Sequence, residues 1–235
     1  MNDLALSIQN VRERINRACL RAGRRPEEIL LIAVTKTVST ERIQGALSEG
    51  LTHFGENYIQ EAQRKIEALG QGTWHFIGHL QKNKAKFAVG LFSMIETLDT
   101  PALGEELNRQ ALKSGRTLEF LIQVNEAGEE TKSGLSPEQV PALLSEIPNW
   151  GALRFRGLMT MPPYDPDPEK SRPWYRSLFR WRQKWQSQFP ELDFKHLSMG
   201  MSHDFEVAIE EGATIIRVGT ALFGTRLTYS RNHIP

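Results

Sequence analysis

Short apolar segments rich in β-branched and aromatic residues alternate with amphipathic helical segments along the whole chain. This alternation is the feature that most constrains the fold, because strand–helix–strand units build parallel sheets. The strands predicted from it cover residues 29–35, 53–56, 74–78, 94–98, 118–125, 153–160, 195–199 and 214–219. The helices predicted between them cover residues 40–49, 58–68, 81–89, 101–113, 137–146, 173–188 and 203–210.

Local signals agree with these boundaries. Ser136 before Pro137 predicts the N-cap and first residue of a helix, because proline suits the first helical position. Gly50, Gly70 and Gly115 follow predicted helices and are typical of helix C-termini.

Eight alternating strands predict an α/β fold, a single (β/α)8 TIM barrel over the whole chain. Residues 1–23 carry apolar side chains at helical spacing and are expected to form an additional covering helix, and residues 226–235 a loose tail. An open, doubly wound sheet is the alternative. That fold favours a G-x-G-x-x-G motif after its first strand, and none follows residues 29–35.

Composition excludes several classes of protein. The formal net charge is +1 and no long run of Lys or Arg occurs, so nucleic acid is not an expected partner. No apolar stretch approaches the roughly 20 residues of a membrane span, so no membrane association is expected. Cys19 is the single cysteine, which excludes an internal disulfide and indicates a cytoplasmic location. His75 and His79 lie in an extended segment, so no metal site is expected.

Lys36 ends the apolar run of the first predicted strand. Burying an ammonium group costs several kcal/mol unless it finds a partner, loses its proton or reacts. A lysine at the carboxyl end of a barrel strand is therefore a candidate for an imine with an aldehyde cofactor.

The loops after the last two predicted strands suit a phosphate group, which often binds there in such barrels. Ser198 ends one strand, and Gly219 and Thr220 end the other. Backbone N–H groups and hydroxyls in these loops are suitable donors to a dianion. Ser202 has a competing role as the N-cap of the next helix.

Arg217 lies two residues before Gly219 and therefore points to the same side of its strand. It could form a buried ion pair with a residue such as Glu56, or donate to a ring nitrogen of a ligand. Because arginine stays protonated, such a ring nitrogen would remain neutral. A lysine, an arginine and a phosphate loop together match pyridoxal phosphate.

Several motifs resemble those of the pyridoxal phosphate homeostasis protein family, also called the proline-synthase co-transcribed family. They are Ala33-Val34-Thr35-Lys36, Phe54-Gly55-Glu56-Asn57-Tyr58, Trp74-His75-Phe76-Ile77-Gly78, Leu80-Gln81-Lys82-Asn83-Lys84, Lys132-Ser133-Gly134, Arg156-Gly157-Leu158-Met159, Leu197-Ser198-Met199-Gly200-Met201-Ser202 and Ile216-Arg217-Val218-Gly219-Thr220. The barrel of this family is similar to the N-terminal domain of alanine racemase, a type III pyridoxal phosphate fold.

The resemblance implies that Lys36 forms the internal aldimine and that Arg217 faces the pyridine nitrogen. It further implies phosphate contacts from Ser198, Gly219 and Thr220, and a ring pocket lined by Asn57, His75, Met159, Gly200 and Ser202. Two of these have simpler alternatives: Asn57 as a helix cap and Met159 as core packing.

The function expected from this resemblance is pyridoxal phosphate homeostasis, in which the protein holds the cofactor and delivers it to apo-enzymes. No second catalytic base is recognisable, so no catalytic residue is assigned. An amino-acid racemase using Tyr58, His75 or a loop lysine is the alternative, and a barrel enzyme acting on a phosphorylated sugar or heterocycle is a third. Lys82, Lys84 and Lys132 are candidates for a second vitamer site or for a solvated surface.

Overall fold

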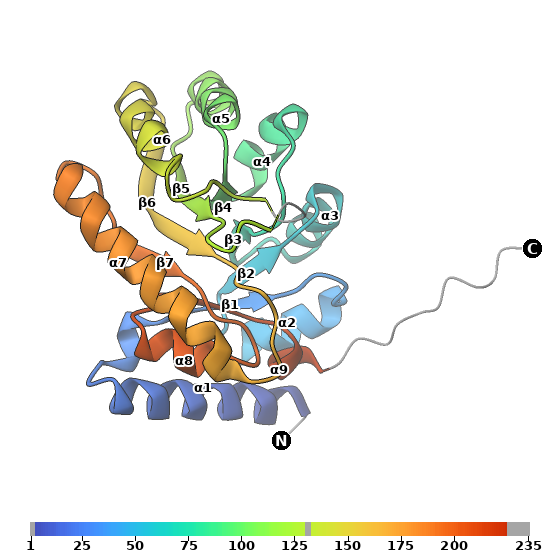
Figure 1. The fold of residues 1–235 in the computed structure, drawn as a ribbon. Coiled ribbons are helices and arrows are strands. Elements are labelled where there is room, and N and C mark those ends of the chain that lie inside the picture. The colour runs from blue at the N-terminus through green and yellow to red at the C-terminus, as the bar shows by residue number, and fades with distance from the viewer. Residues whose placement is uncertain (1–2, 130–132, 225–235) are drawn as a thin grey trace, which may run out of the picture.

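The computed structural model describes residues 3–129 and 133–224. Eight parallel strands form a closed barrel in the order of the chain (Figure 1). They are β1 (Leu30–Val34), β2 (His53–Glu56), β3 (Thr73–Phe76), β4 (Met94–Leu98), β5 (Leu118–Val124), β6 (Leu153–Thr160), β7 (His196–Ser198) and β8 (Ile215–Val218). The predicted (β/α)8 barrel is confirmed, and the open-sheet alternative is wrong because β8 pairs with β1.

The helices of the described residues surround the barrel (Figure 1). They are α1 (Asp3–Arg21), α2 (Thr40–Ser48), α3 (Ile59–Leu69), α4 (Ala85–Leu91), α5 (Pro101–Ser114), α6 (Val140–Glu146), α7 (Arg172–Gln188), α8 (Phe205–Glu210) and α9 (Thr220–Phe223). Short 3-10 turns cover Pro26–Glu28, Lys82–Lys84, Ile147–Asn149 and Pro168–Ser171. No helix among the described residues is long and apolar enough to cross a membrane.

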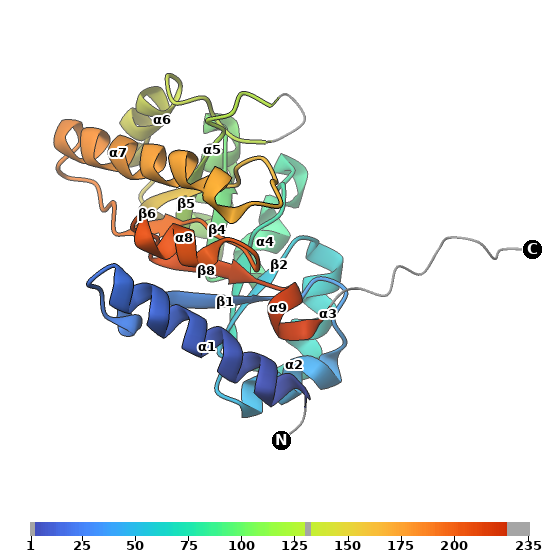
Figure 2. The same cartoon turned by 60° about the horizontal axis from the view of Figure 1, so that its bottom comes forward.

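Helix α1 is the predicted cover. Its buried stripe includes Leu4, Ile8, Val11 and Ile15, which lie on one face at helical spacing. This face packs against α8, α9 and α2, beside the junction of β8 and β1 (Figure 2). Each fully buried aliphatic side chain contributes about 1.5–3 kcal/mol, so α1 is an integral part of the core.

The start of α6 differs from the prediction. Pro137 lies in a turn closed by the Gln139 N–H, which donates to the Ser136 carbonyl, and the helix begins at Val140. Gln139 also accepts a hydrogen bond from the Ser136 N–H through its side chain, so Ser136 is not an N-cap. A second proline, Pro141, occupies the first helical turn instead. The predicted helix ends are confirmed at Gly70 and Gly115, both in the left-handed conformation.

The barrel interior holds both apolar and charged side chains. Ile32, Met94, Leu121, Met159 and Ile215 form a small apolar cluster that is separate from the main core. Glu96 follows Met94 by two residues on β4, and Arg217 follows Ile215 by two residues on β8. Side chains two residues apart point to the same face of a strand, so both charges point inward above this cluster.

Gly157 is required for close packing of β6 on β7. Its φ is +136°, and an added Cβ would overlap the carbonyl oxygen of His196 on the neighbouring strand. Gly157→Ala is therefore expected to lower the free energy of unfolding by at least about 3 kcal/mol, measured by urea denaturation. Gly90→Ala is the control, because nothing lies within 4 Å of its added Cβ. Equal stability of the two variants would contradict the expectation.

Candidate functional site

A pocket of about 350 Å³ lies at the carboxyl ends of the strands, where active sites of such barrels are found. Its lining comes from the ends of β1, β2, β3, β6, β7 and β8. Six of the predicted site residues line it, namely Lys36, Asn57, Ser202, Arg217, Gly219 and Thr220. The barrel closes through the pairing of β1 with β8, and this brings Lys36 next to Arg217, Gly219 and Thr220.

Lys36 lies in a tight turn rather than at the end of β1. The Val38 N–H donates to the Thr35 carbonyl across the turn, at 2.9 Å. Thr37 has a φ of +64°, a conformation that is uncommon for residues other than glycine. Such a conformation persists only where the surroundings hold it, so the turn that presents Lys36 must be fixed from outside.

Lys65 of α3 fixes this turn. Its buried Nζ donates to the Thr35 carbonyl at 2.6 Å and to one oxygen each of Glu56 and Glu61, both at 2.7 Å. The same Glu61 oxygen accepts from the Thr37 N–H at 2.6 Å. One buried lysine therefore holds the residue before Lys36 directly and the residue after it through a carboxylate.

Glu56 completes this cluster from the end of β2. Its Oε1 accepts from the Thr35 hydroxyl at 2.6 Å as well as from Lys65. Burial raises the pKa of the Glu56 carboxyl, and the hydrogen bonds from Lys65 and Thr35 only partly oppose the rise. Glu56 thus pairs with Lys65 and not with Arg217, so the Glu56 pair considered for Arg217 is wrong.

Arg217 reaches the pocket from inside the barrel and is 4% exposed. Its guanidinium donates to the Ser198 hydroxyl and, at 2.9 Å, to the Thr160 carbonyl. Glu96 Oε2 lies 3.9 Å away and is bridged to it by Ser198. Burial lowers the pKa of Arg217 while the Glu96 charge opposes this, and an arginine remains protonated under such conditions.

The two phosphate-type loops are joined by Ser202. Its hydroxyl accepts from the N–H of Gly219 at 3.1 Å and of Ala221 at 3.3 Å. Helix α8 begins at Phe205, so the predicted N-cap role of Ser202 is wrong. The loop that carries Ser202 is anchored by buried Asp204, which accepts from the Met201 N–H and from the Tyr175 hydroxyl, both at 2.7 Å.

The rest of the pocket wall is mostly apolar. Ile77, Met161 and Met201 line it, and the rings of Tyr164 and His203 meet at its mouth with centroids 4.9 Å apart. Asn57 Oδ1 and His203 Nε2 are buried and have no hydrogen-bond partner among the described residues. Apolar walls with a few polar groups left unpaired are typical of a small-molecule site. Asn57 does not cap α3, where Tyr58 is the N-cap residue.

Four predicted site residues do not line this pocket. Ser198 is fully buried, and its hydroxyl is used between Arg217 and Glu96. His75 is 2% exposed and bonds to Glu96 and His53 inside the barrel. Met159 belongs to the apolar interior cluster, as its alternative role proposed. Gly200 has a φ of +95° and lets the loop approach α8, since an added Cβ would lie 2.6 Å from that of Ala208.

The sequence contained signals for two charged residues that were missed. Lys65 interrupts the apolar stripe formed by Ile59, Ala62 and Ile66 on α3. Glu96 lies in the middle of β4, all of whose residues are buried. A charged residue at a buried position indicates an ion pair or a site, but the partner cannot be deduced from one sequence.

Other sequence candidates do not reach this pocket. Lys82 and Lys84 lie on the short turn before α4 and are absent from the pocket lining. Lys132 and the tail 226–235 lie outside the described residues. Among residues 3–129 and 133–224, no group of three or more His, Cys, Asp or Glu side chains is placed to hold a metal ion.

Comparison with known proteins gives consistent matches. The family model of the alanine racemase N-terminal domain matches residues 6–227. The chain is 46% identical over 224 residues to the pyridoxal phosphate homeostasis protein of Aquifex aeolicus, covering 93% of this chain and 96% of that protein. It is 38% identical over 231 residues to the protein of the same name from Escherichia coli, covering 96% of this chain and 98% of that protein.

Solved structures agree in fold. The structure of Synechococcus elongatus PipY without pyridoxal phosphate matches with a TM-score of 0.82 and 38% identity, covering 91% of this chain and 99% of PipY. PipY with pyridoxal phosphate bound matches with a TM-score of 0.81 and 37% identity, covering 91% of this chain and all of PipY. An alanine racemase of Clostridium difficile matches with a TM-score of 0.75 at 12% identity, covering 97% of this chain and 58% of the racemase, which shows a shared fold.

Lys65→Met tests the clamp on the Lys36 turn. The variant leaves the buried carboxylate of Glu56 and the partly exposed carboxylate of Glu61 without their cation, so the free energy of unfolding should fall by about 3–5 kcal/mol in chemical denaturation. Lys86→Met is the matched control, since Lys86 is exposed on α4 and should change stability by less than about 0.5 kcal/mol. A Lys65→Met protein as stable as this control would show that the clamp is unimportant.

Glu126, in the loop after β5, gives a pH test. Burial raises the pKa of its carboxyl to about 7, opposed by a hydrogen bond with Ser177 of α7. The folded protein therefore holds this proton between about pH 4.5 and 7 while the unfolded chain releases it, so stability falls as the pH rises through this window.

Glu126→Gln should remove that decline. Between about pH 5 and pH 8 the variant should gain about 2 kcal/mol relative to wild type, less than the full shift implies because the side chain is partly exposed. The measurement is urea denaturation at both pH values. Parallel pH profiles of the two proteins would refute the assignment.

Proposed function

Because this chain belongs to the pyridoxal phosphate homeostasis protein family, whose barrel is the alanine racemase N-terminal domain, we propose that it binds pyridoxal phosphate and contributes to its homeostasis in the cytoplasm. The observation that carries the proposal is the convergence of Lys36, Arg217 and the Gly219–Thr220 loop on one pocket. An amine, a fixed cation and backbone donors are the three groups that this cofactor requires.

The residues present fit the cofactor. Lys36 would supply the amine for its aldehyde, and Arg217 would donate to its ring nitrogen and so keep that nitrogen neutral. The N–H groups of Gly219 and Ala221 donate to the Ser202 hydroxyl in this structure. Together with Thr220 they are suited to donate hydrogen bonds to the phosphate group. Buried Asn57 Oδ1 has no hydrogen-bond partner among the described residues, and a polar ligand would satisfy it.

When bound, pyridoxal phosphate supplies an electrophilic carbon and an aromatic ring that can accept electrons. The residues around it bind and orient it. Lys65 and Glu61 hold the turn of Lys36, while Ser198 and Glu96 hold Arg217 against the ring position. Asp204 keeps the Ser202 loop in place through Met201 and Tyr175. This arrangement is preorganised for holding one ligand.

A carrier role is favoured over an amino-acid racemase. Two of the bases suggested for a racemase do not line the pocket, since His75 is enclosed in the barrel and Tyr58 is 62% exposed and absent from the lining. Tyr164 lines the pocket and is 72% exposed, and we infer that recipient proteins contact this side of the pocket. Delivery of the cofactor to apo-enzymes is therefore part of the proposal.

Borohydride reduction followed by peptide mass spectrometry tests the proposal. Pyridoxal phosphate should attach to Lys36 at one molecule per chain, and Lys36→Ala should lose the attachment and the visible absorbance band. Lys84→Ala is the control, because Lys84 lies outside the pocket lining and should leave both unchanged. Wild-type protein that remains colourless and unlabelled would contradict the proposal.

A second assay separates the carrier from the racemase. Exchange of the α-proton of amino acids in deuterated water should remain at the rate of free pyridoxal phosphate. Rapid exchange that depends on Lys36 would identify an enzyme instead.

A further inference from the structure

A file of polar side chains crosses the barrel interior below the pocket. The Arg217 guanidinium donates to the Ser198 hydroxyl, which donates to Glu96 Oε2 at 2.6 Å. Glu96 Oε1 lies 3.0 Å from His75 Nδ1, and His75 Nε2 lies 3.1 Å from His53 Nδ1. The file therefore runs through β8, β7, β4, β3 and β2, from the pocket to the opposite end of the barrel.

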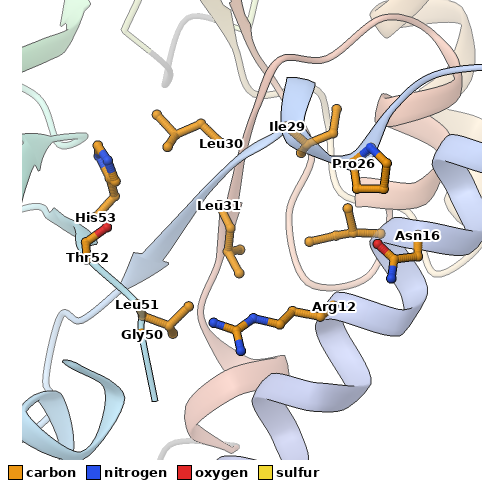
Figure 3. A pocket seen from close by; sticks show the side chains of 11 residues that line it. Arg12, Asn16, Pro26, Ile29, Leu30, Leu31, Gly50, Leu51, Thr52 and His53 are labelled. Atoms are coloured by element: carbon orange, nitrogen blue, oxygen red, sulfur yellow. The ribbon is translucent and has the colours of Figure 1, made fainter. Parts of the chain in front are cut away.

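All members but the last are enclosed. Glu96 and Ser198 are 0% exposed, His75 is 2% and Arg217 is 4% exposed. His53, at the start of β2, is half-buried and lines a second cavity of about 250 Å³. Figure 3 shows this cavity, with His53 on one side and Arg12 and Asn16 of α1 on the other. The file thus has one end at the pocket and one end within reach of solvent protons.

The charge of Glu96 determines the protons of both imidazoles. Burial would raise its pKa, but the His75 hydrogen bond and the nearby charge of Arg217 outweigh burial, so the pKa is lowered and Glu96 is ionised. An ionised carboxylate only accepts hydrogen bonds, so His75 donates from Nδ1. When His75 is neutral, its Nε2 is an acceptor, and His53 must donate to it from Nδ1. The free lone pair of the file is therefore on His53 Nε2.

We propose that Glu96 and His75 are positioning residues for Arg217. His53 is the group at which a proton from solvent changes the net charge of this buried file. With neutral imidazoles the file holds one negative charge on Glu96 and one positive charge on Arg217. A proton from solvent adds to His53 Nε2 without breaking any hydrogen bond, and the file then carries one net positive charge. His75 can share that charge by accepting the Nδ1 proton of His53, beside Glu96.

Protonation of this file affects ligand binding in the pocket, an inference that rests on the proposed function. When a neighbouring imidazolium neutralises the negative charge of Glu96, less of that charge remains to balance the positive charge of Arg217. Conversely, an anionic phosphate ester bound beside Arg217 favours positive charge in the file. Ligand binding and protonation of His53 are therefore linked, and the linkage is reciprocal.

Other titratable and charged groups lie around the file, some of them beside His196 rather than in contact with the file itself. Burial and the neighbouring His75 lower the pKa of His53, so it takes up its proton below the usual range for histidine. The further groups are Arg12 at the His53 cavity, His196 and Lys195 near β7, Glu119 of β5, and Tyr175 and Asp204 near Arg217. Of these, His196 is also half-buried with a pKa lowered by burial, but it bonds to Thr214 outside the file.

The tautomers give a test that needs neither cofactor nor variant. Two-bond ¹H–¹⁵N correlation NMR of the cofactor-free protein at about pH 8 should show a single proton on each of His53 and His75, carried by Nδ1. This is the less common tautomer of a free histidine side chain. A proton on Nε2 of His53 or of His75 would overturn the proposal.

Glu96→Gln tests the direction of control. The glutamine amide can accept from Ser198 with its oxygen and donate to His75 Nδ1 with its nitrogen, so both histidines should change to the Nε2–H tautomer. His196→Gln is the matched control and should leave both on Nδ1. A Glu96→Gln protein that folds and retains the wild-type His53 tautomer would overturn the proposal.

The linkage between ligand binding in the pocket and protonation of His53 is tested by adding pyridoxal phosphate to the protein. Pyridoxal phosphate should raise the pH midpoint of His53 by at least about 0.3 unit, a twofold change in proton affinity. In Glu96→Gln, or in Ser198→Ala if that variant fails to fold, the rise should be lost. An unchanged midpoint in protein whose loading is verified by mass spectrometry refutes the linkage alone. If the protein does not bind pyridoxal phosphate, the proposed function is refuted. The tautomers of His53 and His75 then test the positioning role of Glu96 and His75 separately.

Discussion

The pairing of β8 with β1 is the interaction on which the site depends. Leu30 pairs with Ile215 and Ala33 with Val218, so the first and last strands of the chain lie side by side. Without this closure, Lys36 and Arg217 would lie at opposite edges of an open sheet. With it, both reach one pocket together with Gly219 and Thr220. Helix α1 covers the same junction from outside by packing on α8 and α9 (Figure 2).

Two clusters of buried charge support this pocket from different sides. Lys65, Glu56 and Glu61 fix the turn of Lys36 from the outer layer, between β2 and α3. Glu96 and Ser198 fix Arg217 from inside the barrel. Buried charges are costly unless they are paired and hydrogen-bonded, so the contacts within each cluster hold its side chains in place. The cost in stability is understandable where a reactive amine and a fixed cation must be held in place.

The same arrangement accounts for a binding role. The pocket provides an amine, a guanidinium, backbone donors and apolar walls, while Tyr58 and His75, two of the proton-transfer groups suggested for a racemase, do not line it. His75 in particular has another place, in the file that joins Arg217 to His53. A barrel interior is usually filled with apolar layers, and here one apolar cluster shares it with this polar file. The interior is thus both core and part of the site.

The sequence by itself determined the barrel, the covering helix and several residues that line the pocket, because these follow from local periodicity and from the ends of strands. Lys36, Arg217, Gly219 and Thr220 could be found because each lies near the carboxyl end of a strand, inside it or in the loop that follows, where such barrels bind ligands. Whether Ser198, His75 and Met159 face the pocket or the interior below it was decided by the tertiary structure. Their depth depends on strand register and barrel closure, which bring together residues such as Ser198 and Glu96, 102 positions apart. No local pattern in a single sequence encodes that contact, so Lys65 and Glu96 gained their roles only when their partners were in place.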